Sequence, residues 1–124
     1  MTGRDRGSVS VVAAGVTAIL VAIVLLSVDA ARLLAAQART ETAADAAALA
    51  AAQEQVVASE EDPAGAASRF AAANHAELVA CRCEPGGSKS VVAVRSFGPD
   101  LFLLPDRREL RATARAVVDL PAGS

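Results

Sequence analysis

The most reactive side chains of the sequence are two cysteines separated by one residue, Cys81 and Cys83. This spacing differs from the Cys-x-x-Cys pattern of thioredoxin-like redox sites and zinc knuckles. Positions i and i+2 of a strand point to the same face, so the two sulfurs can lie in the core as buried thiols or form a disulfide. An oxidising, extracytoplasmic setting would favour the disulfide. We interpret the pair as structural rather than redox-active.

Other residue types used in catalysis and ligand binding are sparse. The single histidine, His75, has no partner motif such as Gly-x-Ser-x-Gly or His-Glu-x-x-His, and two cysteines with one histidine do not complete a zinc site. The acidic run Glu60–Asp62 lacks the calcium-loop pattern and fits better as negative charge at a helix start. Gly86-Gly87 lacks the spacing and the lysine of a phosphate-binding loop. We therefore expect no enzymatic activity, no metal site and no cofactor.

Composition argues against two further classes of function. The formal net charge is −2 with both signs scattered, whereas nucleic-acid binding requires clustered Lys and Arg to neutralise phosphates. The 124 residues include no Trp, no Tyr and only three Phe, so the aromatic platforms that stack on bases or sugars are missing. We expect neither a nucleic-acid partner nor a small-molecule substrate.

A long uncharged segment lies near the N-terminus, at residues 8–28. Twelve of the residues from Val9 to Val28 are Val, Ile or Leu. A helix of about 20 residues spans roughly 30 Å, the thickness of the hydrocarbon core of a bilayer. The segment also lacks the polar stripe of a core helix in a soluble domain. It therefore predicts a single transmembrane helix that contacts membrane lipid.

The charges on either side of this segment bear on its orientation. Residues 1–7 form a short head with Arg4 and Arg6, while Arg32 and Arg39 follow the segment, so the arginine counts are equal. The free N-terminal amine adds one positive charge to the head, and the cysteine pair suits an oxidising exterior. We therefore expect a single-pass cell-membrane protein with a cytoplasmic head and an extracytoplasmic C-terminal domain.

Residues 29–60 contain no Pro or Gly and are rich in strong helix formers, which predicts that the transmembrane helix continues as an alanine-rich extension. Eight of the ten residues from Ala43 to Ala52 are alanine. Small side chains let another helix approach closely, so Ala47, Leu49 and Ala51 are the predicted helix-packing residues for contact with neighbouring subunits. Alternatively, the alanines reflect a biased genome and helix propensity alone.

Residues 61–124 predict a small domain that begins with a short helix. Asp62 is placed to cap this helix and Pro63 to occupy its first turn, and the helix is expected to reach about Ala73. Asn74 and His75 can close it. Phe70 and the surrounding alanines are expected to form its packing face.

The rest of this domain shows the two-residue periodicity of strands. Segments Leu78–Cys81 and Ser90–Val94, joined through Glu84–Gly87, predict a β-hairpin. In the third predicted strand the even-numbered residues from Leu110 to Leu120 are apolar and share one face. An antiparallel sheet covered by helix would hide that face. The fold class is therefore α+β, with a long N-terminal helix, a short helix and a small antiparallel sheet.

The predicted connection Phe97–Pro105 is unusually apolar, with four large side chains in succession from Leu101 to Leu104. If these residues are exposed, they would contact a partner or the membrane. The alternative, slightly favoured, is that they fold back over the sheet, because the domain has few other large side chains to fill its core.

Several of these features occur together in one family. The Arg6-Gly7-Ser8 motif, the apolar segment, the motif Val28-Asp29-Ala30-Ala31-Arg32 and the alanine block resemble TadE/TadG-like proteins of the tight-adherence (Flp) pilus system. The closest resemblance is to small actinobacterial TadE-like proteins of the helicase/secretion-neighbourhood type. These share stretches like Ala71–Asn74 and Ala114–Ala116, and the resemblance extends over most of the chain.

The resemblance implies a pilin-like protein that is not an enzyme, a minor pilin or pseudopilin. It would assemble through its N-terminal helix with other pilin, pseudopilin or secretion-system subunits. TadE-type pseudopilins can be cut by a prepilin peptidase after a glycine before the apolar segment, which corresponds to a cut between Gly7 and Ser8. The acidic residue that many prepilins carry five positions past the cut corresponds to Val12 here.

Two alternatives remain open at the level of sequence. In the first, residues 1–30 are a cleavable signal that ends at Ala30 and releases a small secreted binding domain, although the apolar run is longer than the about 7–15 residues usual for signals. In the second, the chain is an accessory single-pass subunit of a secretion complex that is not built into a fibre.

Overall fold

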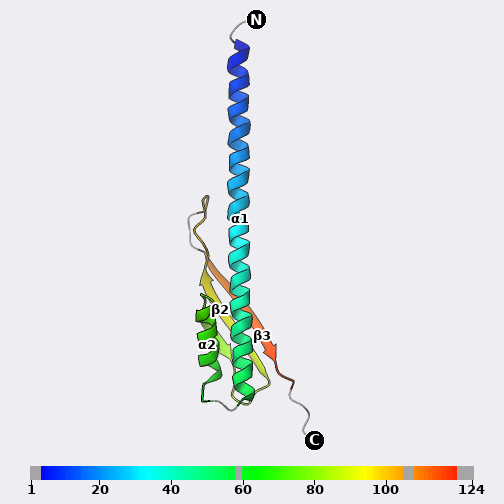
Figure 1. Ribbon diagram of the computed structural model, residues 1–124, viewed down its shortest axis with the longest axis vertical. Helices are drawn as coiled ribbons and strands as arrows, with labels where there is room; N and C mark the ends of the chain where they lie inside the picture. Colours follow the sequence, from blue (N-terminus) through cyan, green and yellow to red (C-terminus); the bar gives the residue numbers. More distant parts are fainter. Residues whose placement is uncertain (1–3, 58–59, 105–107, 120–124) are drawn as a thin grey trace.

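The computed structural model describes residues 4–57, 60–104 and 108–119. Its elements, in chain order, are α1 (Arg4–Val56), α2 (Pro63–Ala73), β1 (Glu77–Arg82), β2 (Lys89–Phe97) and β3 (Glu109–Val117). Figure 1 shows α1 as a long rod whose C-terminal half carries all the other elements, while its N-terminal half extends away from them. This architecture confirms the predicted α+β class.

The helix α1 is 53 residues long, which corresponds to about 80 Å at 1.5 Å per residue. It contains no proline, and its only glycines are Gly7 and Gly15. The helix therefore passes without interruption from the apolar segment 8–28 into the alanine-rich extension, as the sequence predicts. It ends at Val56, after which the Val57 N–H still donates to the carbonyl oxygen of Gln53 (3.0 Å).

The helix α2 has the predicted bounds. Asp62 occupies the N-cap position with an extended backbone, and Pro63 follows in the first turn, but the Asp62 side chain makes no capping hydrogen bond. At the other end the N–H of His75 donates to Ala72 O, and the N–H of Ala76 donates to Ala71 O. His75 has a φ of 59°, so it takes the left-handed position of a Schellman cap. The predicted closing role of His75 is confirmed.

The packing face predicted for α2 was wrong in one residue. Phe70 is 39% exposed and lies against Arg69, with the guanidinium carbon 5.1 Å from the ring centroid. The buried face consists instead of Pro63 and three alanines that follow the helical repeat, namely Ala66, Ala67 and Ala71. These alanines allow a close approach that a phenyl ring on the same face would prevent.

The three strands form one antiparallel sheet in the order β1-β2-β3. In β2, Val92 lies between Cys81 of β1 and Ala114 of β3, and the pairing of β2 with β3 continues in register from Lys89 to Phe97. The register with β1 shifts between Leu78 and Ala80, which leaves Val79 as a bulge. The predicted hairpin and third strand are therefore confirmed.

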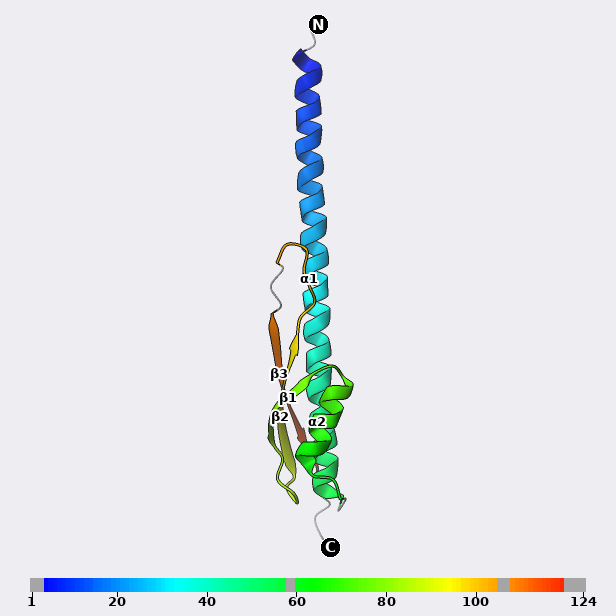
Figure 2. The same cartoon turned by 90° about the vertical axis from the view of Figure 1, so that its left-hand side faces the viewer.

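Both helices cover the same face of this sheet, as Figure 2 shows with the strands on one side and α1 and α2 on the other. In β3 the even-numbered residues from Leu110 to Val118 are the more buried ones, as predicted, whereas Leu120 lies outside the described residues. The core between the layers is made mostly of alanine, and its largest fully buried side chains are Val92, Val94, Thr40 and Ser90.

Four polar side chains fix the position of β2 along α1. The Ser90 hydroxyl donates to Ala48 O (2.7 Å), and the hydroxyls of Thr40 and Ser96 are hydrogen-bonded at 2.6 Å. The Gln55 amide donates to Glu84 O (2.8 Å) and Lys89 O (3.2 Å), which holds the hairpin loop against the end of the helix. Such directional contacts specify the register of the sheet along the helix, which a smooth alanine surface alone does not.

Candidate functional site

The apolar segment 8–28 forms the freely projecting part of α1. Among the described residues, α1 is the one helix long and apolar enough to cross a membrane, with a mean hydropathy of 2.8 over its most apolar stretch and none of that stretch buried. Large apolar side chains are exposed around the whole circumference, from Val9 (69%) to Leu26 (57%). A surface of this kind requires lipid or other protein to cover it.

Two polar side chains of this segment, Thr17 and Ser27, form hydrogen bonds within the helix. The Thr17 hydroxyl donates to Ala13 O (2.9 Å), and the Ser27 hydroxyl donates to Ile23 O (2.8 Å). Each hydroxyl thus bonds one turn back and requires no water, which suits an apolar environment. The segment therefore presents lipid-compatible chemistry at every position from Val11 to Val28.

The apolar segment ends at a buried carboxylate. Asp29 is only 5% exposed, and its two oxygens accept hydrogen bonds from the backbone N–H groups of Phe102 and Leu103, each at 2.9 Å. Two residues more than seventy positions away in the chain are thereby attached to the first turn after the span. Sequence reasoning missed this role of Asp29, although the first charge after a long apolar run was a visible signal.

The apolar connection between β2 and β3 is divided between the two predicted alternatives. Leu101 folds inward and is 8% exposed, while Phe102, Leu103 and Leu104 remain 59%, 45% and 48% exposed. The guanidinium carbon of Arg32 lies 4.6 Å from the centroid of the Phe102 ring. We call residues 101–104 the apolar loop; it is fixed at its base and open at its tip.

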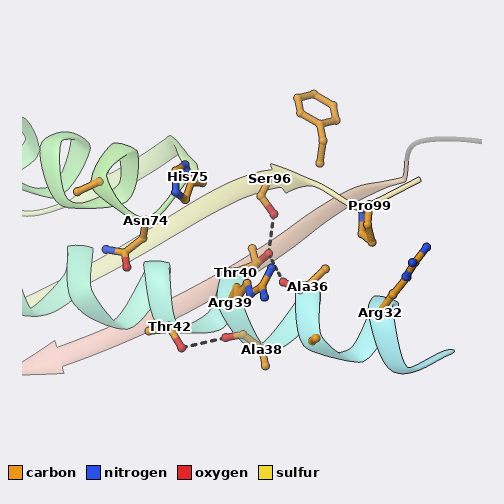
Figure 3. Close-up of a pocket in the computed structure, with 13 residues that line it drawn as sticks. Arg32, Ala36, Ala38, Arg39, Thr40, Thr42, Asn74, His75, Ser96 and Pro99 are labelled. Carbon is orange, nitrogen blue, oxygen red and sulfur yellow. Dashed lines mark hydrogen bonds between the residues drawn. The ribbon is translucent and has the colours of Figure 1, made fainter. Parts of the chain in front are cut away.

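A groove runs along α1 between the end of α2 and the end of β2, with a volume of about 840 Å³. Figure 3 shows Asn74 and His75 towards one end of this groove and Pro99 towards the other, with the Thr40–Ser96 hydrogen bond in its floor. Its ionisable lining residues are Arg32, Arg39 and His75, so its lining carries no acidic side chain. The groove therefore combines basic side chains with a largely apolar lining.

Cys81 and Cys83 form a disulfide within the described part of the chain, with Cα atoms 5.4 Å apart. Both residues are half-buried and lie against the core cluster from the end of β1. The bond links Cys81 near the end of β1 to Cys83, the first residue after the strand, beside the hairpin loop. We therefore interpret the disulfide as structural.

The predicted contacts of Ala47 and Ala51 with neighbouring subunits need correction. Both residues are 0% exposed and belong to the core formed with α2 and the sheet of the same chain. Of the three predicted helix-packing residues, only Leu49 is exposed (56%). The alanine block does bring elements close together, as small residues should, but the elements belong to one domain.

The residues assigned to processing lie at the N-terminal end of α1. Gly7 and Ser8 are helical and exposed, and a Cβ added at Gly7 would meet nothing within 4 Å. Val12, at the position of the acidic residue of many prepilins, is 62% exposed. In the part of the chain that the structure describes, no other predicted site residue lies near this end of the helix.

His75 lines the groove but serves as the cap of α2. Within the described ranges, no three His, Cys, Asp or Glu side chains come together as a potential metal site.

Comparison with known proteins gives one finding. Residues 7–54, which cover almost all of α1, match the family model described as "Putative Flp pilus-assembly TadE/G-like". No curated protein and no solved structure gave a significant match to the chain. The match ends before α2 begins, so it concerns the long helix and not the sheet.

Proposed function

The match along α1 supports classification of this chain as TadE-like, and from that premise we propose that it is a membrane-anchored minor pilin or pseudopilin. The family match supports a role as a component related to Tad pilus assembly. Within this role, the chain assembles through its N-terminal helix with other pilin or secretion-system subunits. In this role the chain is structural and performs no catalysis.

One observation carries the proposal. The apolar half of α1 is exposed on all sides, although the domain covers the other half of the same helix closely. In a membrane this half is solvated by lipid, and in an assembly the same surface can pack against equivalent helices. A structural subunit that is held in a membrane before assembly requires such a helix, with one half exposed to lipid or to neighbouring helices and the other half covered by its own domain.

The cleaved-signal alternative is less compatible with the contacts of Asp29. A cut after Ala30 would remove the carboxylate that accepts hydrogen bonds from Phe102 and Leu103. The apolar loop would then lose its attachment to the helix. A mature protein that retains Asp29 keeps these contacts, whether or not residues 1–7 are removed.

We place the head of the chain in the cytoplasm and the α+β domain outside it. The disulfide between Cys81 and Cys83 supports this orientation, because disulfides persist in oxidising compartments. Arg4 and Arg6 in the head, with the N-terminal amine, are consistent with the positive-inside tendency.

The test combines intact mass with fractionation. We expect the mature chain to be full-length or cut after Gly7, to resist carbonate extraction from membranes, and to be present in sheared pilus filaments. A mass that corresponds to cleavage after Ala30 would contradict the anchor. A protein retained in membranes but missing from purified filaments would instead indicate the accessory-subunit alternative.

Assembly through the helix can be tested by crosslinking in cells. We expect Leu20→Cys, which lies in the apolar segment, to form crosslinks with neighbouring subunits when filaments assemble. Val117→Cys is the matched control, because Val117 is similarly exposed (56%) but lies at the far end of β3. Equal crosslinking of the two variants would argue against the helix as the assembly surface.

A further inference from the structure

We propose that the apolar loop, residues 101–104, is a second membrane contact that inserts Phe102, Leu103 and Leu104 into the interfacial region of the lipid bilayer. The inference rests on the proposed membrane anchor and adds to it. It assigns a partner, a lipid surface, to a part of the small domain that lies far from the apolar helix in sequence.

The apolar loop is attached to α1 at the point where the uncharged segment ends. Asp29, which directly follows the last residue of the uncharged segment 8–28, binds the N–H groups of Phe102 and Leu103. A helix that places residues 8–28 in the hydrocarbon core places Asp29 at its boundary. The tip of the loop is therefore held at the height of the membrane surface. Figure 1 shows the β2–β3 connection extending further towards the N-terminal end of α1 than either strand does.

The loop combines exposed apolar side chains with backbone N–H groups that are already hydrogen-bonded. Three successive large apolar side chains are half exposed, although the backbone N–H groups of two of them are already satisfied by Asp29. Satisfied backbone donors lower the penalty for entry into an apolar medium. Leu101 is buried beneath them and fixes the loop to the domain. The loop thus offers side chains to lipid without exposing unpaired backbone donors at Phe102 and Leu103.

A basic residue, Arg32, lies beside the loop. Arg32 lies one turn beyond Asp29 and stacks on the Phe102 ring at 4.6 Å. An arginine with an apolar stem and a charged head suits the headgroup layer, where the head reaches phosphate and the stem covers apolar surface. The order of apolar tip, ring and guanidinium therefore follows the polarity gradient of a bilayer surface.

Lipid is favoured over a protein partner as the occupant because the loop continues an apolar surface that lipid already covers. Val28, the last residue of the apolar segment, is 36% exposed and directly precedes Asp29, whose carboxylate accepts the hydrogen bonds from the loop. No separate recognition event is required, since insertion of the helix brings the loop to the bilayer.

The chain lacks Trp and Tyr, so single tryptophans can report membrane contact without background. The full chain is reconstituted in phosphatidylcholine–phosphatidylglycerol vesicles that contain lipids brominated at a shallow acyl position. We compare Leu103→Trp with Leu20→Trp in the span and Val117→Trp at the far end of β3. We expect quenching of Leu103→Trp to be about threefold stronger than that of Val117→Trp, because interfacial side chains lie within about 5–10 Å of the acyl boundary.

The outcomes distinguish this inference from the proposed anchor. Quenching at Leu20→Trp with none at Leu103→Trp overturns the lipid contact, leaves the anchor intact and points to a protein partner for the loop. No quenching at either position overturns the anchor as well. Phe102→Trp serves as a second reporter if Leu103→Trp does not fold, and the same quenching difference from Val117→Trp supports the proposal.

Discussion

Each carboxylate oxygen of Asp29 accepts one hydrogen bond from the apolar loop, which attaches the loop to α1. The sequence pattern alone does not reveal these bonds. We expect Asp29→Ala to increase amide hydrogen exchange at Phe102 and Leu103 by about tenfold or more, because hydrogen bonds to a charged group contribute roughly 1.5–3 kcal/mol. NMR of the detergent-solubilised chain measures this. Asp45→Ala is the control, since Asp45 is an exposed carboxylate on the same helix. Unchanged exchange at both loop amides would show that Asp29 does not hold the loop.

An exposed ion pair joins Glu61, which precedes α2, to Arg69 within that helix. The hydrogen bond from Arg69 (2.6 Å) lowers the pKa of the Glu61 carboxyl below its ordinary value of 4.5, and the attraction between the two charges acts in the same direction. The pair therefore favours the folded state above about pH 4.5, and this contribution is lost as the pH falls through the lower, folded-state pKa. We expect Arg69→Gln to raise the pKa of Glu61 towards 4.5, as followed by NMR titration. A titration of Glu61 that does not change would refute this account.

At the scale of elements, the order and type of the helices and strands and the start of α2 could be predicted because each depends on local pattern. The bounds of β2 could not: it runs from Lys89 to Phe97 instead of from Ser90 to Val94, because its pairing with β3 continues to Phe97. Pro63 begins α2, and the alternation in Leu110–Val118 gives the inward face of β3. The partner of the alanine block could not be predicted in this way. Small residues indicate that something approaches closely, but α2 and the sheet become neighbours of Ala47 only through the turns between elements.

The corrected location of Ala47 changes the expected effect of added bulk. Because Ala47 is 0% exposed inside the domain, Ala47→Leu should destabilise the monomer by about 1–3 kcal/mol or more through overpacking. Leu49→Ala is the matched control on the same turn, and its effect on stability should stay within about 0.5 kcal/mol because Leu49 is 56% exposed. Thermal unfolding in detergent compares the two variants. If Ala47→Leu weakened subunit association while the unfolding temperature stayed unchanged, the original intermolecular assignment would be restored.

At the scale of the whole molecule, the apolar helix and the small domain look separable in sequence but share α1 and the Asp29 contacts. Composition predicted the span, and a simple length criterion was sufficient for it. The groove, the attached loop and the polar ties from Ser90 and Gln55 arise from contacts across 29 to 74 positions, which no local pattern encodes. The candidate site could therefore be predicted only in its helical part.

This coupling yields a prediction about the domain without its anchor. A fragment from Ser27 to Ser124 keeps Asp29, whereas a fragment from Ala31 to Ser124 is the product expected from a signal cut after Ala30. Both keep the core between Thr40 and Ala116, so both should fold. The shorter one should be less stable by roughly 1–3 kcal/mol, because Phe102 and Leu103 lose their acceptor. Chemical denaturation followed by circular dichroism measures the difference, and Asp29→Ala in the longer fragment should reproduce it. Equal stability of the two fragments would mean that the domain does not depend on Asp29, and would remove this objection to a cleaved, secreted form.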